Sequence, residues 1–241
     1  AVLSTFIPEF MIMDFPFLWP SEEIMWKVLD GPVGKELMDA AKSKGMVCLG
    51  FMGSGFKQFT ANKPLRTPAD MKSLKMRVMP APLLIAQMKA YGANPTPIDF
   101  SELYNALQQR VVDGQENPIV TIDSMKFYEV QKVITISNHS YLGYGVMANR
   151  KWFEGLPKDI QADIMKAMDY ACKVEREIVH EQEAASLKKM KAYGTEIYVL
   201  NDAEREAFRK ASLPVHQQFA DKVGKDLLEK IYAEIDRLSK K

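Results

Sequence analysis

"PKDIQADIMKAMDYACKVEREIVHEQEAASLKKMKAY", residues 157–193, has the longest helical pattern in the chain. Its apolar side chains recur at helical spacing, Pro157 and Asp159 suit a first turn, and Gly194 suits the end of the helix. An unbroken helix here would be roughly 50 Å long, whereas about 20 residues already cross a small domain. The helix must therefore overhang its domain, kink or join two domains, and we favour the last.

The segments before this helix alternate between strands and helices. Apolar runs predict strands at 45–53, 74–80, 132–137 and 144–149. Helices are expected at 81–92 and 101–114, each with a glycine placed to end it, and Thr67 with Asp70 forms a capping-box pattern for a shorter helix. This alternation predicts an α/β fold.

The composition is that of a globular protein and shows no class-specific bias. The chain has 241 residues, 47% hydrophobic and 26% charged, and a net charge of +1. That balance does not favour nucleic acid or an anionic membrane surface. No run of about 18 apolar residues predicts a membrane span. Cys48 and Cys172 lack metal-type spacing, so we expect unpaired thiols rather than a disulfide.

The sequence gives no sign of catalysis. The three histidines, His139, His180 and His216, are scattered, and none has a partner at metal-ligand spacing. Neither a nucleophile elbow nor a zinc-protease, dinucleotide or phosphate-loop motif occurs. We therefore predict no catalytic residue, no metal site and no cofactor.

Arg77 is the most informative charged residue. It lies in the apolar segment 74–80, on the face opposite Leu74, Met76 and Val78. A guanidinium cannot lose its charge, so a buried one needs an acidic acceptor. That acceptor could be an internal carboxylate, or a ligand carboxylate held by two parallel hydrogen bonds.

A polar cluster follows the second predicted helix in "VVDGQENP" (111–118). We expect Val111 and Val112 to end the helix and the polar residues to form a turn. Asn117 could cap this turn or hydrogen-bond a ligand. Gln115 and Glu116 are expected to support the turn or the arginine.

Phe100 and Lys57 also have two readings each. Phe100 precedes a predicted helix and could pack on it as a hydrophobic staple. Lys57 follows a glycine-rich turn and could simply be exposed to solvent.

Three segments together resemble one family. They are "GFKQFTANKPLRTPADMKSLKMRVMP", "YGANPTPIDFSELYNALQQRVVDGQENP" and "FYEVQKVITISNHSYLGYGVMANRKWFEGLPKDIQ". Their residues are similar to the solute-binding subunits of TRAP (tripartite ATP-independent periplasmic) transporters of the dicarboxylate-binding type. The resemblance implies a two-lobed periplasmic binding protein of type II-like architecture, with a hinge and a long helix that spans both lobes. Lobe I would comprise 1–54 and 143–182, and lobe II 55–142 and 183–241.

The resemblance also implies a ligand site. Arg77 would hold the ligand carboxylate, Asn117 and Lys57 would contact its remaining oxygens, and Phe100 would provide an apolar face. Tyr141 is a further expected contact. Lys57 departs from the arginine common at its position and loses the planar fork.

The implied function is capture of a small organic acid by a periplasmic, monomeric protein that docks on the membrane permease subunits. A sensor domain and an enzyme on a two-lobed scaffold are the alternatives. The opening "AVLSTFIPEFMIMDFPFLWPS" does not read as a signal peptide, because it has no basic n-region and is interrupted by Pro8, Glu9 and Asp14. It resembles a late part of lobe I, so we expect the sequence to be a fragment or a truncated product.

Overall fold

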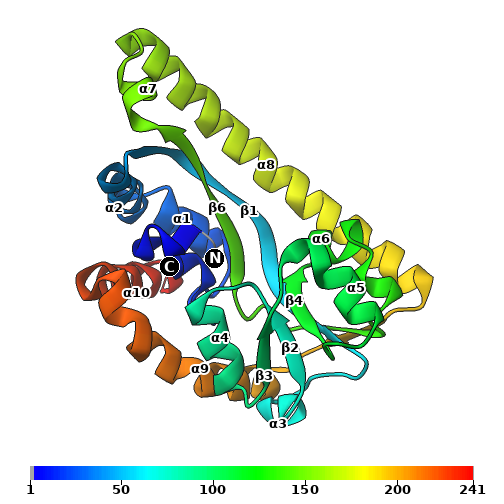
Figure 1. The fold of residues 1–241 in the computed structure, drawn as a ribbon. Helices are drawn as coiled ribbons and strands as arrows, with labels where there is room; N and C mark the ends of the chain where they lie inside the picture. Colours follow the sequence, from blue (N-terminus) through cyan, green and yellow to red (C-terminus); the bar gives the residue numbers. More distant parts are fainter. Residues whose placement is uncertain (1–2, 241) are drawn as a thin grey trace.

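The chain is organised around one long strand. The computed structural model describes residues 3–240, and β1 (Met46–Ala61) runs diagonally through the molecule (Figure 1). The other strands are β2 (Lys75–Val78), β3 (Asn94–Pro97), β4 (Gln115–Pro118), β5 (Val133–Ile136), β6 (Tyr141–Asn149) and β7 (Glu196–Val199). The α-helices are α1 (Glu22–Leu29), α2 (Pro32–Ala40), α3 (Pro68–Met71), α4 (Pro82–Ala90), α5 (Leu103–Gln108), α6 (Ile119–Ser124), α7 (Arg150–Glu154), α8 (Lys158–Tyr193), α9 (Asp202–Val223) and α10 (Lys225–Ser239). The short 3-10 helices are η1 (Leu3–Thr5), η2 (Pro8–Asp14), η3 (Ala41–Lys44), η4 (Phe100–Glu102) and η5 (Phe127–Glu129).

Strand β1 changes partners along its length. From Met46 to Phe56 it pairs antiparallel with β6. From Lys57 onward it pairs antiparallel with β4, and its last residues pair antiparallel with β5, which pairs in parallel with β7. The β1–β6 ladder shifts register between Gly53 and Phe56, just before the change of partner. Such an irregularity bends a strand and increases its twist.

A second, two-stranded sheet joins the first at one point. Strands β2 and β3 are parallel, and an isolated parallel bridge links Met76 to Gly114. The Arg77 N–H donates to the Gly114 carbonyl oxygen at 2.8 Å. A Cβ on Gly114 would lie 2.3 Å from the carbonyl oxygen of Thr60 in β1. Only glycine allows this close approach of β1, β2 and the start of β4.

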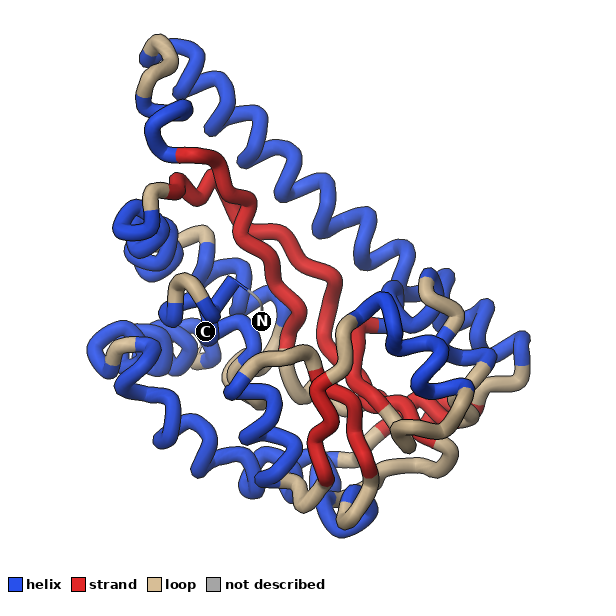
Figure 2. Tube along the Cα trace, in the orientation of Figure 1, coloured by secondary structure: helices blue, strands red, loops and turns tan. Residues whose placement is uncertain are grey.

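The sheet separates two hydrophobic cores. The first lies between the sheet and α1, α2, α4, α9 and α10, and it includes Phe59, Met76 and Phe208. The second lies under α5 and α6 and includes Ile134 and Met190. Figure 2 shows helices on both sides of the strands. Because successive side chains alternate between the faces of a strand, Ile197 of β7 packs on the second core and the next residue, Tyr198, packs on the first.

Local sequence signals define several helix ends as predicted. The Asp70 carboxylate accepts a hydrogen bond from the Thr67 N–H at 2.8 Å, which forms the expected capping box of α3. Gly92, just after α4, and Gly194, just after α8, have φ values of 81° and 103°. These left-handed conformations are the ones that end helices at glycine.

The predicted helix at 101–114 was too long at its C-terminal end, and the predicted turn that follows it was wrong. Helix α5 ends at Gln108, and Arg110 adopts a left-handed conformation with φ 57°. Val111 is therefore outside the helix and about half exposed. The predicted polar turn, 115–118, is instead the fully buried strand β4. Pairing with β1 holds this segment extended, which overrides the local turn signal.

Helix α8 is a single element of 36 residues. At 1.5 Å per residue it is about 54 Å long, and Figure 1 shows it along one side of the whole molecule. Arg176 forms a bidentate pair with Asp30 at 2.6 and 2.9 Å and stacks over Trp26 of the first core at 3.7 Å. Met190 lies in the second core. The helix thus contacts both cores, as expected for a bridging helix.

Candidate functional site

Arg77 is a buried cation with unused hydrogen-bond donors. Its side chain is 1% exposed, and its Nε donates to the Ile98 carbonyl oxygen at 2.8 Å. Nη1 and Nη2 are buried and have no hydrogen-bond partner among residues 3–240. Burial lowers the pKa of Arg77, against the attraction of Glu116 and Asp99, but an arginine stays charged at any physiological pH. The outer edge of this guanidinium is therefore suited to bind an anion.

Phe100 lies beside this guanidinium. It begins η4, its ring centre is 5.9 Å from Arg77 Cζ, and the ring packs edge-on against Phe127 at 6.1 Å. The side chain remains 41% exposed. It can offer an apolar and π surface next to the charged fork.

Asn117 is brought to the same sheet face as Arg77. The isolated bridge pairs Met76 with Gly114, so the next residues, Arg77 and Gln115, point to the opposite face, and Asn117 lies two residues further along β4. Residues two apart in a strand point to the same face. Asn117 is buried, and its Nδ2 donates to Gln115 Oε1. The structure therefore places Phe100 against Arg77 and Asn117 on the same face of the joined strands as Arg77.

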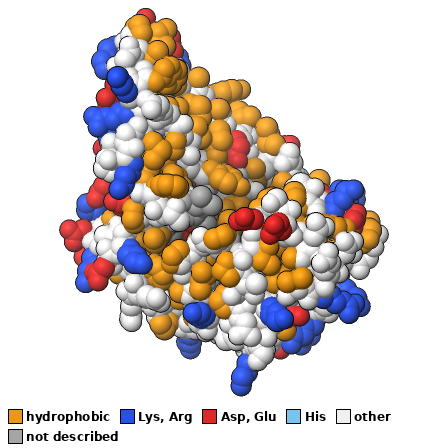
Figure 3. Space-filling model, in the orientation of Figure 1, with side chains coloured by type: hydrophobic (Ala, Val, Ile, Leu, Met, Phe, Trp, Pro, Cys, Tyr) orange, Lys and Arg blue, Asp and Glu red, His pale blue; other side chains and the backbone are white. Residues whose placement is uncertain are grey.

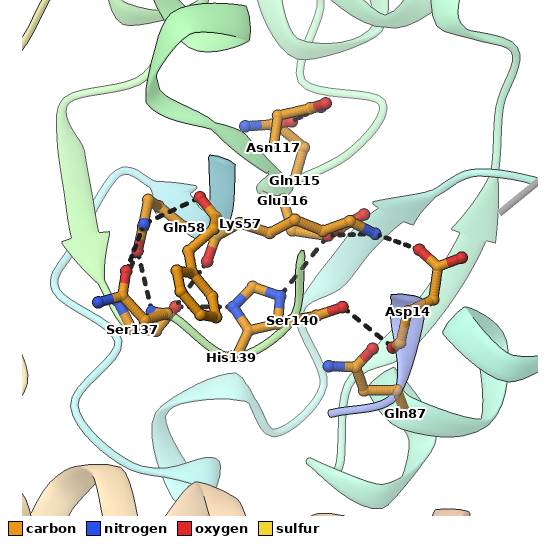
Figure 4. Close-up of polar contacts among 12 residues, drawn as sticks. Asp14, Lys57, Gln58, Gln87, Gln115, Glu116, Asn117, Ser137, His139 and Ser140 are labelled. Atoms are coloured by element: carbon orange, nitrogen blue, oxygen red, sulfur yellow. Dashed lines mark hydrogen bonds and ion pairs between the residues drawn. The ribbon is translucent and has the colours of Figure 1, made fainter. Parts of the chain in front are cut away.

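Lys57 lies in the interior of the protein, within a group of charged side chains. It is fully buried, so the exposed alternative is wrong. Its Nζ lies 3.0 Å from Asp14 Oδ1 and 3.2 Å from Glu116 Oε2 (Figure 4). Glu116 Oε2 is also 3.6 Å from His139 Nε2. Lys57 thus centres a buried charged cluster of Asp14, Lys57, Glu116 and His139.

The protonation states of this cluster follow from burial and pairing. Burial alone would lower the pKa of Lys57, but Glu116 and Asp14 raise it above its ordinary value. Burial would raise the pKa of Glu116, but Lys57 and His139 lower it. For His139, burial outweighs the attraction of Glu116 and lowers the pKa. The cluster therefore holds a charged lysine, a charged glutamate and a neutral histidine at pH 7.

His139 is fixed by its neighbours on every side. Its Nδ1 lies 2.7 Å from the Ser137 hydroxyl, and its ring stacks on Phe59 at 3.9 Å, nearly parallel. The Phe17 N–H donates to the His139 carbonyl oxygen at 2.8 Å. The cluster thereby connects β1 and β4 to the segment that follows η2.

Tyr141 lies in the interior of the first core. It is 1% exposed, and its hydroxyl donates to Glu22 Oε1 at 2.6 Å. Its ring makes edge contacts with Trp26 and Phe56. Burial and the Glu22 carboxylate raise the pKa of this phenol. In this structure Tyr141 links β6 to α1.

The sequence interpretation found part of this arrangement and missed part. It singled out Arg77, Asn117 and Phe100, and it associated Glu116 with the arginine. It missed Asp14, and it treated His139 only as a scattered residue. Asp14 lies 43 positions before Lys57 and His139 lies 82 after it, so neither could be linked to it without the fold. The only local signal of the burial of Lys57 was its place between Phe56 and Phe59.

A surface hollow lies elsewhere, between α8, β1 and β6. It has a volume of about 590 Å³ and is lined mainly by apolar residues. Tyr144, Tyr170 and the carboxylate of Glu175 also line it. Figure 3 shows hydrophobic side chains gathered on this face. None of the predicted site residues lines it. We place the candidate site at Arg77, because a buried charge with free donors identifies a ligand chemistry and an apolar hollow does not.

Neither a metal-ion cluster nor a membrane-spanning helix occurs in the part of the chain that the structure describes. Within residues 3–240, no cluster of three or more His, Cys, Asp or Glu side chains is arranged to hold a metal ion. Over the same residues, no helix combines the length and the apolar character needed to cross a membrane.

Comparison with known proteins gives a consistent result. The model of "Bacterial extracellular solute-binding protein, family 7" (DctP) matches residues 1–222. The C4-dicarboxylate-binding periplasmic protein DctP of Rhodobacter capsulatus is 39% identical over 228 residues, which cover 94% of this chain and 68% of that protein.

Solved structures extend the similarity to three dimensions. A TRAP periplasmic solute-binding protein from Shewanella oneidensis with bound succinate has a TM-score of 0.91 and 36% identity, over 97% of this chain and 77% of that chain. The sugar acid binding protein DctPAm from Advenella mimigardefordensis with galactonate has a TM-score of 0.92 and 34% identity, over 98% and 77%. These structures confirm the predicted fold class and resemblance. The chain therefore belongs to the bacterial extracellular solute-binding proteins of family 7, the DctP family of TRAP transporters.

Proposed function

We propose that this protein captures a small organic acid at Arg77 and delivers it to the permease subunits of a TRAP transporter. The observation that carries the proposal is the buried guanidinium whose Nη1 and Nη2 have no hydrogen-bond partner among the described residues. A carboxylate matches this fork with two parallel, charge-assisted hydrogen bonds. It would also supply the charge compensation that a buried cation requires.

The similar proteins support a carboxylate ligand. Their names and structures include a C4-dicarboxylate-binding protein, a succinate complex and a galactonate complex. All three ligand types carry at least one carboxylate. We propose that Asn117 and Phe100 complete the contacts of this chain around the acid. Lys57 and Tyr141 would support the site without touching the acid, Lys57 through its ion pair with Glu116 and Tyr141 through its hydrogen bond to Glu22.

Capture would proceed by closure of two lobes about the strand β1 and helix α8. Lobe I would comprise 1–54 and 143–182, and lobe II 55–142 and 183–241. The ligand stabilises the closed form by the free energy with which it binds that form more tightly. We propose that the protein acts in the periplasm as a monomer, without chemical turnover of the acid.

Replacement of Arg77 tests the proposal. Arg77→Met keeps much of the side-chain volume and removes the charge. We expect organic acids to raise the melting temperature of the parent protein and to leave that of Arg77→Met unchanged, because the loss of the charged pair costs about 2–5 kcal/mol of binding free energy. Thermal shift and calorimetry with succinate, malate and galactonate provide the measurement.

The unliganded variant provides the control. Burial disfavours the charged guanidinium, and Nη1 and Nη2 have no hydrogen-bond partner among the described residues, so Arg77→Met without ligand should melt at or above the temperature of the parent. Undiminished binding by Arg77→Met would place the site elsewhere. A variant that fails to fold would instead assign Arg77 to an internal structural role.

A further inference from the structure

A buried chain of side-chain hydrogen bonds ends at Asn117. Gln131 Nε2 donates to the Val130 carbonyl oxygen at 3.1 Å, and Gln131 Oε1 accepts from the Thr60 hydroxyl at 3.0 Å. Thr60 Oγ1 in turn accepts from Gln115 Nε2 at 3.0 Å, and Gln115 Oε1 accepts from Asn117 Nδ2. We call Gln131, Thr60 and Gln115 the amide relay. All of its members are at most 2% exposed.

The direction of every bond in the amide relay is determined from one end. A backbone carbonyl only accepts, so the Gln131 atom facing Val130 must be Nε2 and the one facing Thr60 must be Oε1. The single Thr60 proton is then committed to Gln131. The Gln115 atom facing Thr60 must therefore be Nε2, and the atom facing Asn117 must be Oε1. Asn117 can satisfy that oxygen only with its Nδ2.

The cross-strand neighbour of Asn117 does not compete for its free atoms. Gln58 lies opposite Asn117 in the β1–β4 register. Its Nε2 donates to Phe56 O and Asn138 Oδ1, and its Oε1 accepts from the N–H groups of Ser137 and Asn138. The Gln58 amide is thus fully committed. Asn117 Oδ1 takes part neither in these bonds nor in the amide relay.

We propose that the amide relay makes Asn117 a hydrogen-bond acceptor for the ligand, and that the site therefore selects 2-hydroxy acids over the corresponding unsubstituted acids. This inference rests on the proposed function. Arg77 offers only donors, which suit a carboxylate, whereas Asn117 Oδ1 needs an O–H or N–H. A hydroxyl on the carbon next to the carboxylate supplies that donor. An unsubstituted acid leaves Oδ1 without a partner when the site excludes water.

Matched acids test the inference. Calorimetry of the full chain with L-malate and succinate, and with 2-hydroxyglutarate and glutarate, measures the effect of one hydroxyl. We expect the hydroxy acid of a bound pair to bind about tenfold more tightly, which is typical of one buried hydrogen bond. Thr60→Val preserves the shape of the side chain and removes the hydroxyl proton that is donated to Gln131. The amide groups of Gln115 and Asn117 can then rotate and exchange their donor and acceptor atoms. The tenfold preference should then fall to about twofold or less.

Thr60→Ser is the matched control, because it retains the hydroxyl and should retain the preference. The ratio of the two dissociation constants is the decisive quantity, since general loosening of the site would weaken both acids alike. If Thr60→Val does not fold, Gln131→Leu interrupts the relay one step earlier and should have the same effect.

The possible outcomes separate this inference from the proposed function. A parent that binds both acids of a pair equally, in an Arg77-dependent way, overturns the selectivity alone. A preference that persists in Thr60→Val or Gln131→Leu overturns the role of the amide relay. A parent that binds no acid of either pair, nor galactonate, overturns the proposed function and the inference with it.

Discussion

Glu116 is the residue that connects the two buried cations. It is 3.2 Å from Lys57 Nζ, and its charge also acts on Arg77. Neither of its carboxylate oxygens is hydrogen-bonded in a normal geometry within residues 3–240, although both are buried. Its contribution is therefore mainly electrostatic. Its removal would leave Lys57 with Asp14 as its remaining close carboxylate.

We expect Glu116→Gln to destabilise the protein by about 3–5 kcal/mol, because it breaks a buried ion pair while leaving the lysine charged. Urea unfolding at pH 7.5 measures the change in the free energy of unfolding. Glu206→Gln is the matched control, since Glu206 pairs with Arg209 on the exposed face of α9. The control should unfold almost like the parent. Equal stability of Glu116→Gln and the control would contradict the account.

The residues of the site differ in how far sequence alone could identify them. Arg77 was recognisable because arginine in an apolar strand needs an acceptor wherever the strand lies. Lys57 was ambiguous because lysine is common at exposed positions. Its burial is compensated by Asp14 and Glu116, which reach it only through η2 and β4. The fold, rather than local sequence, determines that partnership.

At the scale of elements, Gly114 joins the two sheets. It bridges Met76 of β2 and lies against the Thr60 carbonyl of β1. Gly114→Ala would place a methyl group 2.3 Å from that oxygen, so strands must move apart. We expect a loss of about 1–3 kcal/mol, typical of overpacking. Urea unfolding measures it.

The same substitution should weaken organic-acid binding, because Gly114 also accepts from the Arg77 N–H and sets the register of β2 against β4. Calorimetry with the tightest-binding acid measures this effect. Gly155→Ala is the comparison for binding, because Gly155 lies in the turn after α7 and not where Gly114 joins the two sheets. A Gly114→Ala variant with the stability and affinity of the parent would show that β1, β2 and β4 can move apart at this residue without cost.

Helix and strand predictions failed at the same place for one reason. The spacing of Leu103, Leu107 and Val111 continues a helical pattern beyond the point where α5 ends. The following residues pair with β1, and that pairing requires an extended chain from Gln115 onward. Local periodicity carries no information about a partner strand more than 50 positions earlier. By contrast, α8 was predicted well because its length and caps are encoded within the helix itself.

At the scale of the whole molecule, the buried His139 and the partly buried His216 make stability depend on pH. Burial lowers the pKa of His139 and of His216 from 6.5. His216 Nε2 is 2.6 Å from the Pro16 carbonyl and its Nδ1 lies next to the Tyr232 hydroxyl, so the neutral ring is already fully used. The unfolded chain therefore binds more protons than the folded chain near pH 6.

It follows that the free energy of unfolding is highest above pH 6.5 and falls as the pH decreases below that value. The lowered pKa of Glu116 adds a further loss below about pH 4.5. Urea midpoints at pH 7.5, 6.5 and 5.5 measure the effect. His216→Gln should lose less stability between pH 7.5 and 5.5 than the parent. A parent with the same midpoint at all three values would contradict this prediction.

Strand β1 has a consequence for the way the molecule comes apart. Its residues Cys48, Phe51, Phe59 and Ala61 lie in the first core, and it is hydrogen-bonded to β4, β6 and β5, whose Ile134 lies in the second core. Loss of order in either core therefore breaks hydrogen bonds of this strand. The two halves are therefore thermodynamically coupled, and the backbone amides of β1 should exchange with solvent deuterium only when the entire chain opens.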